Sequence, residues 1–270
     1  MSTVFVTLSD AAYYSKAKRT IIDLRTAGQW TGHIVYIAVD FQPNENYCRF
    51  YGVTVKSFPR IPTERLIPQS REQPLSIPTH DRREFAKVTQ WEKLHAFDPY
   101  FCAWERVVFL DAGLRIFDSV RHFLSLKWRG RLLAQDDTGG DTSKGFGCQL
   151  ELKNNPEALG RLVETYGADI LTRPYFLNCM WIYDTALLET VTKEELIDVM
   201  NDYPLWRTNE MGVMNVVFAF KYRVWSPFPV WTAEQQRKRL FDWCETNNPG
   251  TRWYDYCALK YPITINMECE

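Results

Sequence analysis

The segment best suited to chemistry is the run Arg106-Val-Val-Phe-Leu-Asp-Ala-Gly-Leu114. Its apolar residues are typical of a short strand buried on both faces, and the run ends in one carboxylate, Asp111, followed by Ala112 and Gly113. Open α/β sheets bind ligands at the carboxyl ends of their strands, so a carboxylate at this point is placed to contact a ligand. A second interpretation is that Asp111 only caps the turn after the strand. The surrounding elements have to decide between the two.

Cysteine and histidine chemistry is not indicated by the sequence. The seven cysteines show no C-x-x-C spacing, and an odd number cannot pair completely within one chain. The four histidines are scattered through the first half. We therefore expect reduced, structural thiols and neither a zinc cluster nor a Cys/His nucleophile pair.

Upstream of Asp111, apolar runs and helical periodicity predict a β-α-β-β start, then a long loop and a helix. The loop spans residues 59–82, which hold five prolines, and Pro99 follows the helix. The predicted elements are strand 3–8, helix 13–27 ended by Gly28, strands 33–39 and 53–58, and helix 83–97.

Downstream of Asp111, strands and helices continue to alternate. We predict strand 132–134, a polar turn with the loop acids Asp136 and Asp137, helix 156–168, strand 176–183 interrupted at Asn178, and helices 193–200 and 210–220. This order predicts an α/β fold with a mixed, mostly parallel sheet and helices on both faces.

Composition limits the partners. The chain has 270 residues, 46% of them hydrophobic, and its 32 basic and 33 acidic residues nearly cancel. No global field favours nucleic acid or an anionic membrane surface. No apolar run approaches the roughly 20 residues that span a bilayer. We therefore expect one soluble, cytoplasmic domain over residues 1–270, with no nucleic-acid partner and no membrane span.

Five segments carry a resemblance to a known family. They are Val6-Thr-Leu-Ser-Asp10 with Tyr14-Ser-Lys-Ala17, Lys93-Leu-His95, Asp111-Ala-Gly113, Phe176-Leu-Asn-Cys-Met180 and Asn209-Glu-Met-Gly-Val-Met-Asn215. In this order they resemble the nucleotide-sugar-dependent glycosyltransferases of family 8, the glycogenin and bacterial galactosyltransferase group, which have the GT-A fold. The resemblance covers residues 3–220.

The resemblance implies that the first half, residues 1–130, holds a nucleotide. In the family a Thr-rich turn after the first strand precedes a tyrosine that packs near the base, and a Lys-Leu pair faces the donor. The implied cofactor-binding residues are Thr7, Ser9, Asp10, Tyr14, Lys93, Asp111 and Gly113. Tyr13 could replace Tyr14, and either ring could simply cover the sheet. Lys93 would offer a point charge to the diphosphate, although a single lysine more often faces solvent.

The resemblance also implies a metal site, with the motif D-x-D and a histidine in a C-terminal H-x-G-x-x-K-P-W segment holding Mn²⁺ or Mg²⁺. Here Asp111 is the only carboxylate of the first motif, and no histidine follows His122. Asp111 is thus the candidate metal ligand, and we expect weak metal binding. A basic side chain, Lys93 or Lys260, could partly replace the cation; Lys260 lies in the segment 257–262, which loosely resembles the C-terminal motif.

The second half, residues 131–270, would hold the sugar and the acceptor. By resemblance, Asn178 reaches the sugar and Glu210 takes the position of an acid near the transferring sugar; both are candidate catalytic residues. An acid at a helix start also stabilises the helix dipole, so Glu210 has a structural interpretation as well.

We therefore predict a glycosyltransferase that moves a sugar, from a UDP-sugar by preference, to a hydroxyl on a glycan or protein-linked acceptor, with retention of configuration. One alternative is a non-catalytic nucleotide-sugar or glycan-binding protein on the same fold. A second is a sugar-1-phosphate nucleotidyltransferase, which usually has a Gly-rich phosphate loop; residues 9–12 contain no glycine.

Overall fold

The computed structural model describes residues 2–63, 66, 88–121, 124, 126, 129–138, 144–153 and 155–228, together with the backbone of 241–242. Structural statements below refer to these residues. Most of the predicted loop 59–82, the first residues of predicted helix 83–97, and the segment 257–262 with Lys260 lie outside them.

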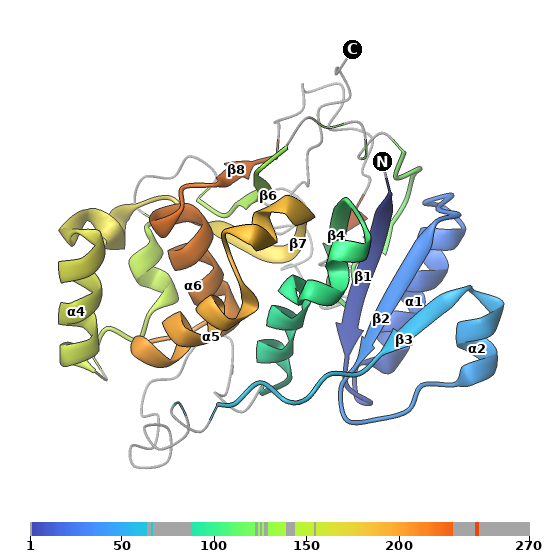
Figure 1. Ribbon diagram of the computed structural model, residues 1–270, viewed down its shortest axis with the longest axis horizontal. Coiled ribbons are helices and arrows are strands. Elements are labelled where there is room, and N and C mark those ends of the chain that lie inside the picture. Colours follow the sequence, from blue (N-terminus) through green and yellow to red (C-terminus); the bar gives the residue numbers. More distant parts are fainter. Residues whose placement is uncertain are drawn as a thin grey trace, which may run out of the picture.

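A seven-stranded sheet forms the centre of the fold, in the order β3-β2-β1-β4-β7-β6-β8 (Figure 1). Strands β3, β2, β1 and β4 run parallel, β7 runs antiparallel to both of its neighbours, and β8 is parallel to β6. The predicted mixed, mostly parallel sheet is confirmed. The strands are β1 (Thr3–Ser9), β2 (His33–Ala38), β3 (Val53–Lys56), β4 (Arg106–Leu110), β6 (Leu132–Asp136), β7 (Phe176–Asp184) and β8 (Trp225–Pro227), with β5 (Arg115–Ile116) and β9 (Phe241–Asp242) in a separate pair.

Helices cover both faces of this sheet. The α-helices are α1 (Tyr14–Arg25), α2 (Glu45–Phe50), α4 (Pro156–Tyr166), α5 (Lys193–Asp202) and α6 (Glu210–Met214), and α6 continues as the π-helix η7 (Asn215–Lys221). The 3₁₀ helices are η1 (Val88–Phe97), η2 (Pro99–Ala103), η4 (Phe146–Gln149), η5 (Ala168–Thr172) and η6 (Thr185–Glu189). Helix α1 packs on one face of the sheet, while η1, α5 and α6 contribute to the core on the other face.

Strand β1 shows why both faces are covered. Val4, Val6 and Leu8 enter the core beneath η1, whereas Phe5 enters the core beneath α1. Successive side chains point to opposite faces of a strand, so an apolar run without alternation needs two apolar layers. With both faces closed, polar side chains can meet a ligand only where strands end.

The start of the chain differs from the prediction. Helix α2 lies between β2 and β3, so the order is β-α-β-α-β. The Asn44 side chain caps α2 by accepting a hydrogen bond from the Tyr47 backbone N–H at 2.9 Å. A helix of six residues is too short for a periodic apolar signal, which explains why it was missed. Strand β3 also ends at Lys56, two residues before the predicted end.

Two later predictions are confirmed only in part. Asn178 does not end a strand, because β7 is assigned as one strand from Phe176 to Asp184. The predicted irregularity is present in the pairing with β6, where Ala134 pairs with Trp181 but Gln135 pairs with Leu177, so that Asn178 lies in the unpaired stretch 178–180. Such a bulge tolerates an Asn that would weaken a regular strand.

The helix predicted over 210–220 is not α-helical throughout. It becomes π-helical at Asn215, whose side-chain amide donates to the carbonyl oxygens of Phe176 and Met211, both at 2.9 Å. These bonds tie the helix to β7, and such a constraint often accompanies a change of helix type.

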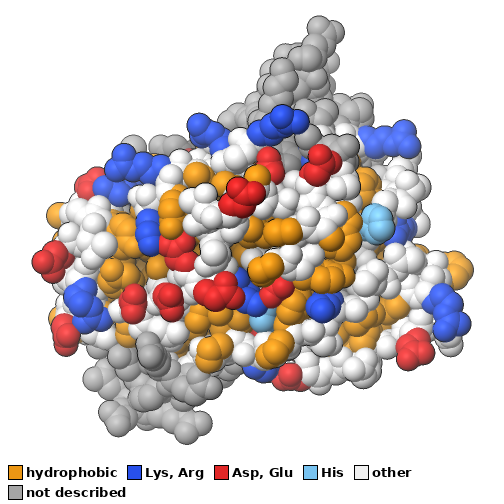
Figure 2. Space-filling model, viewed as in Figure 1, with side chains coloured by type: hydrophobic (Ala, Val, Ile, Leu, Met, Phe, Trp, Pro, Cys, Tyr) orange, Lys and Arg blue, Asp and Glu red, His pale blue; other side chains and the backbone are white. Residues whose placement is uncertain are grey.

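Acidic and basic side chains are interspersed over the face shown in Figure 2, as the small net charge leads one to expect. Among the described helices, none combines the length and the apolar character required to cross a bilayer.

Candidate active site

Four residues that are far apart in the sequence meet at the carboxyl end of β4. The Lys93 ammonium lies 2.7 Å from Asp111 Oδ1 and 3.0 Å from Glu210 Oε1. The Asn178 side-chain amide donates to the same Glu210 oxygen at 2.8 Å. We call Lys93, Asp111, Asn178 and Glu210 the ion cluster. Each was predicted from a separate segment, and the structure joins them in one network.

The backbone holds each member of the ion cluster in place. Asp111 follows β4 directly, and its N–H donates to the Cys179 carbonyl oxygen of β7 at 2.8 Å. Lys93 is carried by η1, which is anchored because Trp91 and Leu94 are buried in the core. Glu210 is the first residue of α6, and Asn178 lies in β7. The cluster thus joins two strands and two helices.

Burial makes these charges depend on one another. Glu210 is 2% exposed and Lys93 8%. Burial by itself lowers the pKa of the Lys93 ammonium, but the Asp111 and Glu210 carboxylates outweigh it, and the pKa is raised above its usual value. Lys93 therefore stays protonated. With both carboxylates ionised, the cluster carries one positive and two negative charges.

One oxygen in the cluster has no partner. Glu210 Oε2 is buried and makes no hydrogen bond within the described residues. Two of the three N–H groups of the Lys93 ammonium meet the carboxylates, which leaves one for another acceptor. A buried polar atom without a partner is costly and often marks a place where a ligand completes the bonding. The cluster can therefore offer one acceptor and one donor to a bound molecule.

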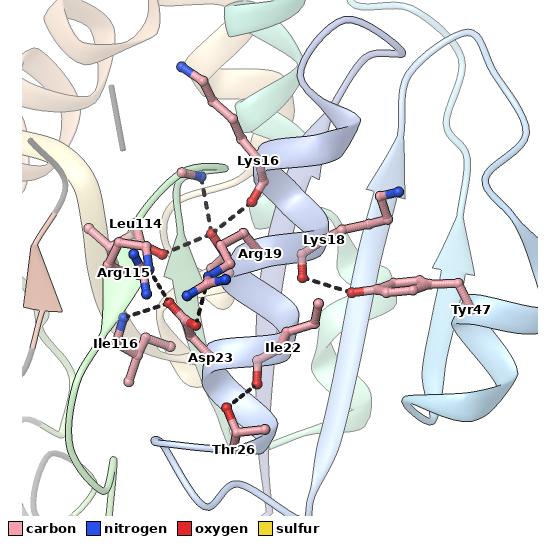
Figure 3. Close-up of polar contacts among 12 residues, drawn as sticks. Lys16, Lys18, Arg19, Ile22, Asp23, Thr26, Tyr47, Leu114, Arg115 and Ile116 are labelled. Atoms are coloured by element: carbon pink, nitrogen blue, oxygen red, sulfur yellow. Dashed lines mark hydrogen bonds and ion pairs between the residues drawn. The ribbon is translucent and has the colours of Figure 1, made fainter. Parts of the chain in front are cut away.

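Helix α1 clamps the chain just after Asp111 (Figure 3). The Thr20 hydroxyl accepts from the Gly113 N–H at 3.0 Å and donates to the Leu114 carbonyl oxygen at 2.9 Å. One turn further along, Asp23 Oδ2 accepts from Arg115 Nε at 2.5 Å and from the Ile116 N–H at 3.4 Å. The N–H of Gly113, a predicted cofactor-binding residue, is thus already bonded within the protein.

At the end of β1, the predicted residues Ser9 and Asp10 make contacts within the protein. Ser9 Oγ lies 2.6 Å from the Tyr36 hydroxyl. Asp10 accepts from the Tyr13 N–H and from the Thr89 hydroxyl, both at 3.0 Å, and so links β1 to the start of η1. These residues shape the edge of the site beside the ion cluster.

Thr7 and Tyr14, also predicted here, differ in their surroundings. Thr7 Oγ1 is buried and has no hydrogen-bond partner in the described part of the chain. Tyr14 packs on Tyr36 with 5.9 Å between ring centroids, accepts from the Asn44 N–H, and has a raised pKa because it is partly buried. Tyr13 is the more exposed residue, at 39%. Of these two tyrosines, Tyr13 is therefore the more accessible to a ligand.

Sequence reasoning missed two residues beside the cluster. The Asn209 side-chain amide donates to Gln90 Oε1 at 2.5 Å, which joins the start of α6 to η1. Asn209 is buried and has φ +53° and ψ −127°, a backbone conformation that residues other than glycine rarely adopt. Asn tolerates positive φ better than most residues, which was the one available signal; nothing in the sequence marks Gln90.

The described donor set does not fit a divalent cation. Asp111 faces an ammonium at 2.7 Å, and a glycine stands two residues later, where D-x-D has its second carboxylate. No group of three or more His, Cys, Asp or Glu side chains in the described chain is arranged to hold a metal ion.

The sheet order, with β7 antiparallel between β4 and β6 and an acid at the end of β4, defines the GT-A fold of the nucleotide-diphospho-sugar transferases. No family model matches the sequence, and no curated protein matches it. Solved structures do.

The galactosyltransferase LgtC, solved with donor and acceptor sugar analogs, matches with a TM-score of 0.53 at 12% identity over 83% of this chain and 73% of LgtC. The glycosyltransferase GlyE of Streptococcus pneumoniae matches at 0.53 and 11% over the whole of this chain and 55% of GlyE. Core-mannan synthase A of Aspergillus fumigatus, in an Mn/GDP form, matches at 0.53 and 9% over 84% and 73%. The chain thus has the GT-A fold and resembles glycosyltransferases, LgtC of family 8 among them, at low identity.

Proposed function

We propose that the protein is a glycosyltransferase that moves a hexosyl or pentosyl group from a nucleoside diphosphate sugar to a hydroxyl acceptor. One observation carries the proposal: Lys93, Asp111, Asn178 and Glu210 converge in a buried cluster at the carboxyl end of β4. On a GT-A fold this edge of the sheet is where a ligand meets the ends of several strands.

In this proposal the two halves of the chain divide the donor between them. Residues 1–130 hold the nucleotide part of the donor, and UDP is the preferred nucleotide. Residues 131–270 hold the sugar and the acceptor, which is a glycan or a protein-linked hydroxyl. The ion cluster lies at the junction, because Lys93 and Asp111 come from the first half and Asn178 and Glu210 from the second.

The atoms available suit charge stabilisation. In the transfer, the bond between the anomeric carbon and the diphosphate oxygen breaks, and its electron pair leaves with the nucleoside diphosphate. A bond to the acceptor oxygen forms, and the acceptor's proton leaves with the diphosphate. The Glu210 carboxylate would stabilise positive charge at the anomeric carbon while Oε2 accepts from a sugar hydroxyl, and Lys93 would oppose the charge growing on the diphosphate. We propose retention of configuration.

A non-catalytic nucleotide-sugar-binding protein is the second candidate. It is favoured by Gly113, which replaces a carboxylate that the resemblance implies for the donor site. Turnover separates the two candidates.

Thermal shift with a panel of UDP- and GDP-sugars tests the donor class, because ligand at 100 times its dissociation constant adds about 2.7 kcal/mol of stability. A donor that raises the melting temperature is then supplied with a set of glycan acceptors, and release of nucleoside diphosphate is measured. Acceptor-dependent release supports the enzyme. Saturable binding without release supports the binding protein, and no binding to any nucleotide sugar would reject both.

A further inference from the structure

The position of the Lys93 ammonium resembles that of a bound cation. It lies between two carboxylate oxygens, 2.7 Å from Asp111 and 3.0 Å from Glu210, and both side chains come from elements fixed in the core. Asp111 is the residue that a metal at this edge would need first. Because the Lys93 ammonium already contacts Asp111, a divalent ion would have to compete with a charge that is covalently part of the protein.

Gly113 removes the other half of a metal site. Its φ of +106° lies in the region that side chains disfavour, and its N–H is held by the Thr20 hydroxyl. A carboxylate could not be placed here without strain in a segment that α1 clamps. The backbone conformation at Gly113 and its lack of a side chain therefore both argue against a second carboxylate ligand at this position.

The charges of the ion cluster also argue against a divalent ion. With Lys93 present, the cluster has a net charge of −1 and holds its cation through short contacts to both acids. Without Lys93, two carboxylates that meet at one point would carry −2, which is the charge that a divalent ion matches. The lysine thus satisfies the two acids and keeps one N–H for an outside acceptor.

We propose that the Lys93 ammonium is the cation of the donor site, and that the protein binds the diphosphate of its nucleotide sugar without a divalent metal ion. This inference rests on the proposed function for the identity of the ligand. It departs from the Mn/GDP form of core-mannan synthase A, whose fold this chain shares.

Titration of the wild-type protein with UDP and with GDP, in EDTA and again in about 1 mM MnCl₂, tests the inference directly. We expect the dissociation constant for the diphosphate that binds to change by less than about twofold between the two buffers, since no step of binding recruits a metal. Binding that disappears in EDTA and returns with micromolar Mn²⁺ would overturn the proposal.

The variant Lys93→Met supplies the converse experiment. It should lose diphosphate affinity in EDTA by about tenfold or more, because a charge-assisted contact is removed. It should also gain a response to metal alone, with MnCl₂ raising its melting temperature by about 2–4 °C where the wild type shows no rise. The matched control is Lys153→Met, which removes the same charge from an exposed lysine and should behave as wild type in both respects.

The metal-only experiment separates this inference from the proposed function. If neither diphosphate binds in any buffer, the donor assignment fails, while the Mn²⁺ response of Lys93→Met still decides whether the ammonium stands in for a cation. Equal Mn²⁺ stabilisation of the wild type and the variant would overturn the inference. If Lys93→Met does not fold, the wild-type titration in EDTA remains decisive.

Discussion

Two buried carboxylates, Asp23 and Glu210, lie on opposite faces of the sheet and differ in how completely they are bonded. Asp23, a residue of α1 that is 5% exposed, engages both oxygens: Oδ1 pairs with Arg19 at 3.1 Å, and Oδ2 accepts from Arg115 and from the Ile116 N–H. Glu210, 2% exposed at the start of α6, accepts from Lys93 and Asn178 at Oε1, whereas Oε2 has no donor in the described chain.

This difference separates a structural acid from one that is prepared for a ligand. Folding selects arrangements in which buried charges are matched, so a fully bonded Asp23 needs no explanation beyond stability. An unmatched buried oxygen carries a cost that a bound hydroxyl would remove. Four experiments test whether the two carboxylates differ in this way.

The largest effect is expected for Glu210→Gln, which keeps size and hydrogen bonding but removes the charge. If the carboxylate stabilises positive charge at the anomeric carbon, the turnover number should fall on the order of 100-fold, with a much smaller change in donor affinity. Steady-state kinetics and donor titration on the same variant measure both. A lower melting temperature with intact turnover would make Glu210 a structural acid like Asp23.

Asp23→Asn should show the opposite pattern. The substitution weakens bonds to two arginines, of which Arg19 is half-exposed, so we expect a loss of about 2 kcal/mol, less than for a fully buried pair. That corresponds to a fall of about 4–8 °C in melting temperature. Turnover per folded molecule should stay near that of the wild type. A large loss of turnover without a loss of stability would mean that the α1 clamp acts in the reaction.

Substitutions of Asn209, the neighbour of Glu210, test whether its backbone conformation lowers the stability of the protein. Glycine adopts φ +53° without the clash that a Cβ causes, so Asn209→Gly should be more stable than Asn209→Ala by about 1 kcal/mol. Both variants lose the bond to Gln90, so the pair isolates the backbone term. Chemical denaturation of the two proteins gives the difference. Equal stability would show that the conformation at position 209 costs nothing.

The smallest effect is expected from pH. The folded-state pKa of Lys93 is raised above its ordinary value of 10.5, so its ion pairs are fully present below that pH and are lost only as the pH rises through the folded-state pKa. Affinity for the intact donor should therefore change by less than about twofold from about pH 7.5 to 9.5, a range above the pKa of phosphate groups. A tenfold decline over this range would mean that the carboxylates do not hold the proton on Lys93.

Much of the fold follows from local patterns. Two apolar runs, residues 3–8 and the run before Asp111, predicted strands, because a strand buried on both faces is apolar at successive positions. The structure contains both strands, β1 and β4, and they pair in parallel. Two features were not predicted: helix α2, which is too short to show a helical period, and the 3₁₀ type of η1, because its apolar spacing suits an α-helix equally well. Asp111 was predicted from a physical pattern, a carboxylate at the end of a buried strand, whereas Lys93, Asn178 and Glu210 were located by resemblance.

Local sequence placed Asp111 at the end of a strand and Glu210 at the start of a helix, since those positions depend on neighbours in the chain. Tertiary structure alone decided that Asn178 and Glu210, 32 positions apart, share a hydrogen bond, and that Lys93 reaches both acids. It also decided that Asp23 is satisfied and that one oxygen of Glu210 is not. Whether a buried atom finds a hydrogen-bond partner depends on the groups around it. Segments that are distant in the chain supply those groups only after the sheet and its two helical layers have packed.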